Sequence, residues 1–309
     1  MARAELIADR GAGAAGTEFF RSRAFYDAEG VTHTLRVEGP GSRAAVALIV
    51  REVPRSELGD ATSPYGYPGA EVEGAEPLPP TDVDWRETGL IAIFARERLA
   101  RPHWLAGARE RSRVLVHDPE RPRRVRTRLA EQIRSNERRG WTVEALDGPA
   151  AGPQERDAFH RAYLETMRRA GAGERYLFDG AYLEAILGFE RSWLLLARHR
   201  GARAGAGAIA ALSDGVLHYY LGGTADAGLG DSPFKNVVDA MIALADELAV
   251  PLNLGGGVEP GDGLETFKRG FANAEIPFHT HEVVCDPAEY ERLAGDRPET
   301  GFFPRYRGA

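Results

Sequence analysis

The chain has little cysteine and lysine and no long hydrophobic run. Its one cysteine, Cys285, excludes an internal disulfide and a cysteine-rich metal site, and the apolar run 283–285 predicts an inert buried thiol. The longest apolar runs, such as residues 44–50, suit buried strands and fall well short of the roughly 20 residues that span a bilayer. The N-terminus lacks the apolar stretch of a secretory signal. We therefore expect a cytoplasmic protein with no membrane span.

Histidine and charge also restrict the possible partners. Only His279 and His281 have ligand-like spacing, and with no evident third ligand we expect surface residues and no bound metal. The net charge of −7 argues against general coating of nucleic acid. Residues 121–139 contain eight arginines. This segment is interpreted as a solvated helix, and a phosphate-rich partner could still dock there.

Length and composition favour two domains. At 309 residues, with 43% hydrophobic and 28% charged residues, the chain is long enough for two cores. A Gly/Ala/Pro segment at residues 148–153 separates two halves with different patterns. We predict one module over residues 1–146 and a second over residues 147–309.

The first half has mainly the pattern of short strands. Strands are expected at residues 32–37, 44–51 and 89–94, followed by a helix at residues 125–140. Gly140 is a typical residue to end that helix. Residues 1–16 are interpreted as a frayed leader. A turn-rich loop at residues 60–69 carries Tyr65 and Tyr67, and residues 71–84 should form a surface loop.

The second half mixes helices and strands. The expected helices are residues 154–169, 181–187, 233–248 and 264–271, and the expected strands are residues 193–198, 205–212, 216–222, 251–254 and 281–285. Ser232 and Pro233 are interpreted as the N-cap and first residue of the third helix. This order predicts an α/β (α+β) module with a mixed sheet.

Lys268 is one of only two lysines in the chain, the other being Lys235. In a helix over residues 264–271, Leu264, Phe267 and Phe271 form one apolar stripe, and Lys268 lies on it. A buried ammonium is costly unless an anion or a developing negative charge lies opposite, although the side chain could also extend its amine to water. Lys235 is expected in a solvated pair with Asp239.

A strand and three glycines precede this helix, which is the pattern of a site. Residues 255–257 allow a sharp bend or a close approach of backbone to a ligand. We interpret this stretch, including Gly256, mainly as the bend that aims the Lys268 helix. Tyr219 and Tyr220 alternate in the strand at residues 216–222, so one should be core and the other should face the site.

Several motifs of the second half together resemble one family. They are Glu165-Thr-Met-Arg-Arg-Ala170, His218-Tyr-Tyr-Leu-Gly222, Leu254-Gly-Gly-Gly257, Phe267-Lys-Arg-Gly-Phe271 and Asp286-Pro-Ala-Glu-Tyr290. The chain resembles the Fem-type (FemAB-like) aminoacyl-tRNA-dependent transferases of the GNAT superfamily. This resemblance implies two tandem GNAT-like modules, each a mixed, mostly antiparallel sheet flanked by helices, with an acceptor groove in or beside their interface.

The resemblance also implies a reaction and a set of site residues. Family members form an amide by moving an aminoacyl group from aminoacyl-tRNA to an amine, usually of a peptidoglycan precursor or a peptide-like metabolite. Lys268 takes the family's role of stabilising negative charge. The implied substrate-binding residues are Phe267, Thr166, Arg168, Arg169, Tyr219, Tyr220, Tyr65, Tyr67 and Gly256. Among the tyrosines, Tyr220 corresponds better to the family's acceptor-contacting residue.

Departures from the family pattern keep alternatives open. The chain lacks the N-terminal lysine and the coiled-coil insertion of the peptidoglycan-building branch, which favours a smaller amine acceptor. Residues 225–231 correspond to a CoA-binding loop without its leading Arg or Gln and with two aspartates, so acyl-CoA is the alternative donor. A non-catalytic scaffold that binds an anionic ligand is a third hypothesis. His218, Asp262 and Glu265 are candidate general bases.

Overall fold

The computed structural model describes residues 1–74, 76–99, 101, 103–201, 204–257, 259 and 261–308. The chain divides into two compact units, Met1–Ser112 with Pro277–Ala309 (unit 1) and Arg113–Ile276 (unit 2). The predicted boundary between residues 146 and 147 differs from these bounds. The 148–153 segment includes a short 3-10 helix, Gly148–Ala150, at the start of the long helix α3 inside unit 2. Among the described residues, no helix has both the length and the apolar character of a membrane span.

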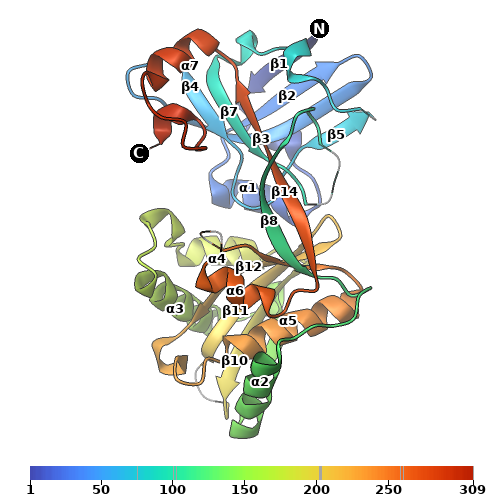
Figure 1. Ribbon diagram of the computed structural model, residues 1–309, viewed down its shortest axis with the longest axis vertical. Coiled ribbons are helices and arrows are strands. Elements are labelled where there is room, and N and C mark those ends of the chain that lie inside the picture. The colour runs from blue at the N-terminus through green and yellow to red at the C-terminus, as the bar shows by residue number, and fades with distance from the viewer. Residues whose placement is uncertain are drawn as a thin grey trace. The chain divides into compact units, whose positions relative to one another are not determined.

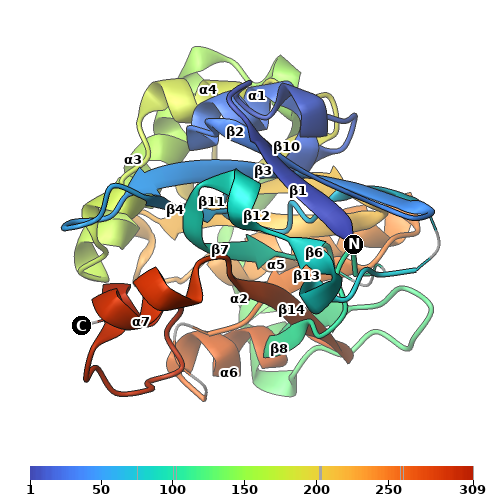
Figure 2. The same ribbon diagram turned by 90° about the horizontal axis from the view of Figure 1, so that it is seen from above.

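Unit 1 is built on a mixed, mostly antiparallel sheet in the order β6-β1-β2-β3-β4-β7-β14, with β5 paired to β3. Its strands are β1 (Ala2–Ile7), β2 (His33–Gly39), β3 (Ser42–Glu52), β4 (Gly59–Thr62), β5 (Glu71–Gly74), β6 (Val83–Asp84), β7 (Leu90–Arg96) and β14 (Ala274–Val284). The parallel pairs are β1 with β6 and β4 with β7. Figure 2 shows β1, β2 and β3 from above.

The helices of unit 1 are α1 (Arg23–Glu29) and α7 (Pro287–Ala294). The side chain of Asp286 accepts a hydrogen bond from Glu289 N and so caps α7. Tyr290 of α7 packs with Ile91 of β7 in a small core cluster, and Figure 2 shows the red α7 beside this sheet. A larger cluster covers the sheet elsewhere and includes Leu35, Val46 and Ile93.

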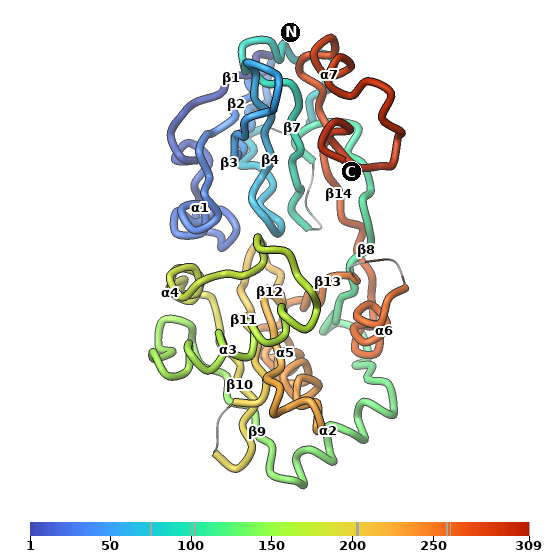
Figure 3. Tube along the Cα trace, turned by 90° about the vertical axis from the view of Figure 1, so that its left-hand side faces the viewer, coloured from blue at the N-terminus to red at the C-terminus, as the bar shows by residue number. Residues whose placement is uncertain are grey.

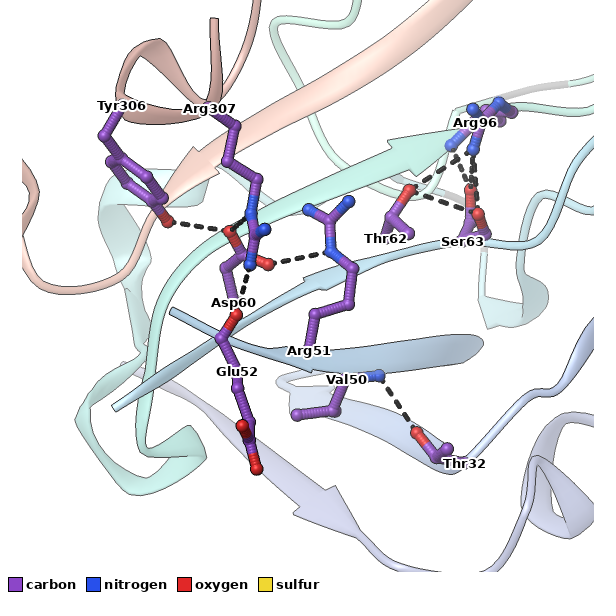
Figure 4. Close-up of polar contacts among 10 residues, drawn as sticks. All are labelled: Thr32, Val50, Arg51, Glu52, Asp60, Thr62, Ser63, Arg96, Tyr306 and Arg307. Carbon is purple, nitrogen blue, oxygen red and sulfur yellow. Dashed lines mark hydrogen bonds and ion pairs between the residues drawn. The ribbon is translucent and has the colours of Figure 1, made fainter. Parts of the chain in front are cut away.

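A buried carboxylate ties the C-terminal segment to unit 1 (Figure 4). Asp60 of β4 is 0% exposed. It accepts hydrogen bonds from Arg51 Nε at 2.9 Å, Tyr306 Oη at 3.0 Å and Arg307 Nε at 2.5 Å. Arg307 also donates to the carbonyl of Glu52 at 2.6 Å. Residues from both ends of the unit 1 sequence therefore satisfy one buried charge.

Unit 2 contains the remainder of this strand order, β8-β13-β12-β11-β10-β9. Its strands are β8 (Arg109–His117), β9 (Trp141–Asp147), β10 (Ser192–His199), β11 (Ala204–Ser213), β12 (Val216–Thr224) and β13 (Leu252–Gly255). The pairs are antiparallel except for β12 with β13. The chain passes between the units along β8 and β14, which are neighbouring strands (Figures 1 and 3).

The described part of unit 2 has five α-helices: α2 (Thr127–Arg139), α3 (Pro153–Arg169), α4 (Gly180–Leu187), α5 (Phe234–Leu248) and α6 (Gly263–Arg269). Gly140 ends α2 in a left-handed conformation with φ of 98°, as predicted. The core includes Leu217 of β12, Met241 of α5 and Phe271 after α6. The helices predicted at residues 125–140, 154–169, 181–187, 233–248 and 264–271 are confirmed to within about two residues.

Three local predictions were wrong. The supposed frayed leader contains β1, because Ala2 and Ala4 are buried and the strand pairs with β2. The supposed surface loop at residues 71–84 begins with β5, whose exposed acidic side chains hide the strand pattern. Ser232 has φ of 51°, and Pro233 occupies the N-cap position of α5 in its place. Together these results show an α/β chain whose units each contain a part of one mixed, mostly antiparallel sheet with helices packed on it.

Candidate functional site

Lys268 is the buried cation of unit 2. Only 8% of the residue is exposed, and its Nζ donates a hydrogen bond to the carbonyl of Gly256 at 2.8 Å. The same Nζ lies 5.4 Å from the centroid of the Tyr219 ring, in a cation–π contact. Burial lowers the pKa of Lys268 to about 8, and the nearby Asp262 carboxylate partly opposes this shift. The ammonium is thus held by a carbonyl and a ring.

The glycine bend after β13 makes room for this ammonium. Gly255 has φ of 75°, and a Cβ built on it would lie 3.2 Å from Nζ of Lys268. The amide of Gly255 donates to Asn253 Oδ1 at 2.8 Å, and Asn253 Nδ2 lies 3.1 Å from Nδ1 of His218. Asn253 and His218, which are both buried, therefore hold the bend in place. Residues 258 and 260, further along the predicted segment, lie outside the described residues.

Tyr219 and Phe267 form the aromatic part of the Lys268 environment. Both rings contact Phe234 of α5, with centroid separations of 5.7 Å and 6.3 Å. A Cβ on Gly222 would lie 2.5 Å from the Tyr219 hydroxyl and 2.7 Å from Phe234 Cζ, so glycine at this position leaves space for the tyrosine ring. The predicted apolar stripe is only partly correct, because Leu264 is 41% exposed while Phe271 is buried.

Tyr220 lies in a different environment from Tyr219. It is 9% exposed, and its hydroxyl makes a short hydrogen bond with the hydroxyl of Tyr182 in α4. The β11–β12 register shifts between Ile209 and Ala210, opposite Tyr220, and such bulges re-aim side chains. One tyrosine is core and the other is half-buried, as the alternation predicted. The ring of Tyr219 contacts Lys268.

Thr166 and Arg169 connect α3 to the end of β12. Thr166 Oγ1 accepts from the amide of Thr224 at 2.8 Å and from Arg169 at 2.9 Å. Arg169 also donates to the carbonyl of Thr224 at 2.6 Å and forms an ion pair with Asp226. Arg168 is exposed. Of these three predicted ligand-binding residues, two already have structural partners, and Arg168 faces solvent.

Tyr65 and Tyr67 belong to unit 1. Tyr65 is 46% exposed, and its backbone amide donates to Glu29 at 3.0 Å. The Tyr67 ring packs edge-on against Phe278 at 5.0 Å. Arg96 donates to the carbonyl of Ser63 at 2.8 Å and so holds the start of the loop that carries both tyrosines (Figure 4).

The three candidate bases differ in environment. Asp262 caps α6 by accepting from the amide of Glu265 at 2.7 Å. The pKa of Glu265 is lowered by the hydrogen bond from the Gly261 amide and by its pairing with Arg269, so its carboxylate is a weaker base than usual. Burial lowers the pKa of His218 to about 4, which keeps its imidazole neutral at physiological pH. His218 touches Asn253 and contributes to the fixed bend.

Four of the seven amides in the loop at residues 225–231 already donate hydrogen bonds, two of them within the loop. The amide of Asp226 donates to the Glu165 carboxylate, and those of Gly228 and Leu229 donate to carbonyls within the turn. A Cβ on Gly228 would lie 2.4 Å from the carbonyl oxygen of Gly205, so this glycine lets the 3-10 turn Asp226–Gly228 pack closely on the start of β11. Asp231 accepts from Arg139 and Trp141. The loop has few amides left for an anion.

Comparison with known proteins identifies the fold of the chain. No family model matches the sequence, and no curated protein matches it. Among solved structures, FemX aligns with a TM-score of 0.58 at 12% identity, over 84% of this chain and 89% of FemX. The chain has a Fem-type fold. This fold agrees with the one that the resemblance of the sequence motifs implied.

Two further structures share the Fem-type fold. The C-terminal domain of a protein assigned as a lysylphosphatidylglycerol synthetase from Agrobacterium fabrum aligns with a TM-score of 0.55 at 16% identity, over 80% of this chain and 82% of that domain. L-PGS from Bacillus licheniformis aligns with a TM-score of 0.52 at 12% identity, over 79% of this chain and 81% of that protein. At these identities the likeness establishes the fold.

Sequence reasoning missed several residues of the site. Phe234 and Asn253 shape the surroundings of Lys268 without belonging to a quoted motif, and Gly222 was quoted in a motif without a role at the site. Gly222 lies two residues after Tyr220, and a glycine in a strand beside bulky residues is a signal of close packing. The expectation for His281 was wrong, because this residue is 2% exposed and lies 2.5 Å from the carboxylate of Glu97.

Proposed function

We propose that the chain is an aminoacyltransferase, which moves an aminoacyl group from aminoacyl-tRNA to the amine of a peptide-like or small-molecule acceptor. The observation that carries this proposal is the buried ammonium of Lys268 in a Fem-type fold. An ammonium in a poorly hydrated site is positioned to stabilise an oxyanion, which is the main electrostatic demand of acyl transfer. Gly256 and Tyr219 fix its position.

The reaction requires no redox step. The neutral acceptor nitrogen attacks the ester carbonyl, a C–N bond forms, and the negative charge moves to the carbonyl oxygen near Lys268. The C–O bond of the ester then breaks, and the ribose oxygen of the tRNA leaves with the proton from the amine. This route needs no protein base, which fits a site whose carboxylates already cap α6 or pair with arginine.

Arginines support tRNA as the donor. Within the described residues, Arg124, Arg128, Arg134 and Arg138 are exposed along or beside α2 and make no ion pair. They are available for phosphates of the RNA backbone, and binding should then weaken with salt. Arg168 is a further exposed cation in unit 2. In contrast, the loop at residues 225–231 does not favour CoA, because four of its seven amides already donate hydrogen bonds and Asp226, Asp231 and Glu165 make it acidic.

The test is a transfer assay with charged tRNA. The purified chain is incubated with tRNA, synthetases, radiolabelled amino acids and a panel of small amines and peptides. Amide products survive mild base, whereas the aminoacyl ester is cleaved. We expect product formation that ribonuclease abolishes. Lys268→Ala should lower the rate by about 100-fold or more, the usual effect of losing an oxyanion donor.

Lys235→Ala is the matched control, because Lys235 is the only other lysine and its Nζ donates to Ser232 Oγ. This variant should retain the wild-type rate. Transfer that resists ribonuclease and requires an acyl-CoA would overturn the tRNA donor. Absence of transfer with every donor would favour the scaffold hypothesis, and equal transfer rates for the two lysine variants would overturn the role of Lys268.

A further inference from the structure

Two neighbouring strands of unit 1 bring histidines and a carboxylate together. β14 carries His279 and His281, which are two residues apart and so share one face of the strand. Glu97 directly follows β7, and its amide donates to the carbonyl of His279 at 3.1 Å. The register therefore places Glu97 beside both histidines. None of these residues belongs to the transfer site proposed for unit 2.

His103 joins this group from the segment after β7. Its ring lies 4.7 Å from the His279 ring and 6.0 Å from the His281 ring, measured between centroids. One ligand atom from each of Glu97, His103 and His281 lies within 4.8 Å of the others. The closest pair is His281 Nε2 with Glu97 Oε1 at 2.5 Å, and His103 Nδ1 lies 3.7 Å from the same oxygen. The three donors converge on one point.

The cluster is enclosed on the side of the strands. Glu97 and His281 are 1% and 2% exposed, and the Trp104 ring packs edge-on against His281 at 5.3 Å. Nδ1 of His103 is shielded from solvent and makes no hydrogen bond. A buried nitrogen with no partner is costly, and a metal ion would satisfy it.

We propose that Glu97, His103 and His281 bind one divalent transition-metal ion of the zinc type. Two imidazoles and one carboxylate are a donor set that zinc accepts in four-coordinate sites, with water in the remaining position. The contact between Glu97 and His281 would open slightly to admit metal–ligand bonds of about 2.0–2.2 Å. The ion would link the segment after β7 to β14, and the packed Trp104 ring would orient one ligand.

The experiment uses the full chain without a histidine tag, stripped of metal by a chelator. Zn²⁺ is titrated in competition with a chromogenic chelator, and Co²⁺ is used separately as a spectroscopic probe. We expect the wild type to bind one equivalent of Zn²⁺ and to give the intense visible absorption of four-coordinate Co²⁺. His103→Asn should weaken Zn²⁺ binding by more than about 100-fold, beyond the effect of losing an outer-shell partner.

His33→Asn is the matched control, because His33 is a half-buried histidine of the same unit, bonded to Thr32 and outside the cluster. Its affinity should equal that of the wild type, and circular dichroism checks that each variant is folded. The proposal is overturned if the wild type binds no stoichiometric Zn²⁺, or if folded His103→Asn binds as tightly as the wild type. Weak Co²⁺ absorption typical of a six-coordinate surface ion would also overturn it, whatever the variants do.

Discussion

Burial of the Lys268 ammonium lowers the stability of the folded chain, and the same burial suits the residue to its proposed role in transfer. Its pKa is about 8 in the folded chain and about 10.5 when the lysine is in water. Between these values the unfolded chain binds more protons than the folded chain, so stability rises with pH across that window. Below about pH 8 the lysine is charged in both the folded and the unfolded chain, and the full stability penalty applies. The penalty shrinks as pH rises and disappears above about pH 10.5. The two pKa values differ by an amount equivalent to roughly 3 kcal/mol.

Lys268→Met should stabilise the chain at pH 7 and remove transfer activity. The expected gain in the free energy of unfolding is up to roughly 3 kcal/mol, because a flexible apolar side chain replaces a buried charge. Urea unfolding at pH 7 and at pH 10 measures it, and the gain should shrink at the higher pH. A variant less stable than the wild type at pH 7 would show that the bond to Gly256 and the Tyr219 contact outweigh the burial of charge.

The pH dependence of transfer should report the same group. If the ammonium stabilises the oxyanion, the rate falls as pH rises through about 8, where Lys268 loses its proton. Lys268→Arg keeps the charge at all these pH values, so any activity it retains should lack the falling limb. Hydrolysis of the aminoacyl ester without protein is measured in parallel and subtracted. A wild-type rate that keeps rising above pH 8 would contradict the electrostatic role.

At the residue scale, the sequence correctly predicted a position where a charged residue lies on an apolar helix face. Lys268 was predicted to lie among phenylalanines, and it is buried beside Phe267 and Phe271. Leu264 was predicted for the same stripe but is exposed, since a helix of under two turns need not bury every apolar position. The contact with Tyr219 was beyond prediction because it depends on how β12 and α6 pack.

At the scale of elements, the Asp60 cluster fixes the last residues of unit 1 to β4. Arg307→Met should lower the free energy of unfolding by about 1–3 kcal/mol, because the fully buried Asp60 loses one of its donors. Arg51 and Tyr306 remain, which limits the loss.

Asp60→Asn provides the matched second variant. In the Arg307→Met background the neutral amide removes the poorly compensated charge, so the double variant should be more stable than the sum of the two single effects. Denaturant melts of the four proteins in this cycle measure the coupling. Strict additivity of the unfolding free energies would mean that the stability effect of the Asp60 charge does not depend on Arg307.

Elements with end signals were predicted well, and elements without them were not. Gly140 and Asp262 mark the end of α2 and the start of α6. β8 was missed because its first residues, 109–113, are exposed and mostly charged. β14 was predicted only at residues 281–285, although it begins at Ala274. Its earlier part contains a proline and charged residues, which weaken the pattern of a strand.

At the scale of the whole molecule, the sequence predicted two modules and a Fem-type fold but placed the boundary differently. A linker-like composition at residues 148–153 suggested a division that the compact units do not share. The group of Glu97, His103 and His281 was also missed for a topological reason. β7 and β14 are neighbours in the sheet, yet nearly the full length of unit 2 separates them in sequence. Spacing rules cannot detect ligands brought together in this way.

The course of the chain through β8 and β14 has a consequence for biosynthesis. Unit 2 is one continuous stretch, so all of its residues have left the ribosome once Ile276 has emerged. Unit 1 begins earlier but lacks β14 and α7 until its second segment is translated. The edge of β7 that pairs with β14 therefore stays unpaired while unit 2 is synthesised. The order of completion during synthesis is thus the reverse of the order in which the two units begin.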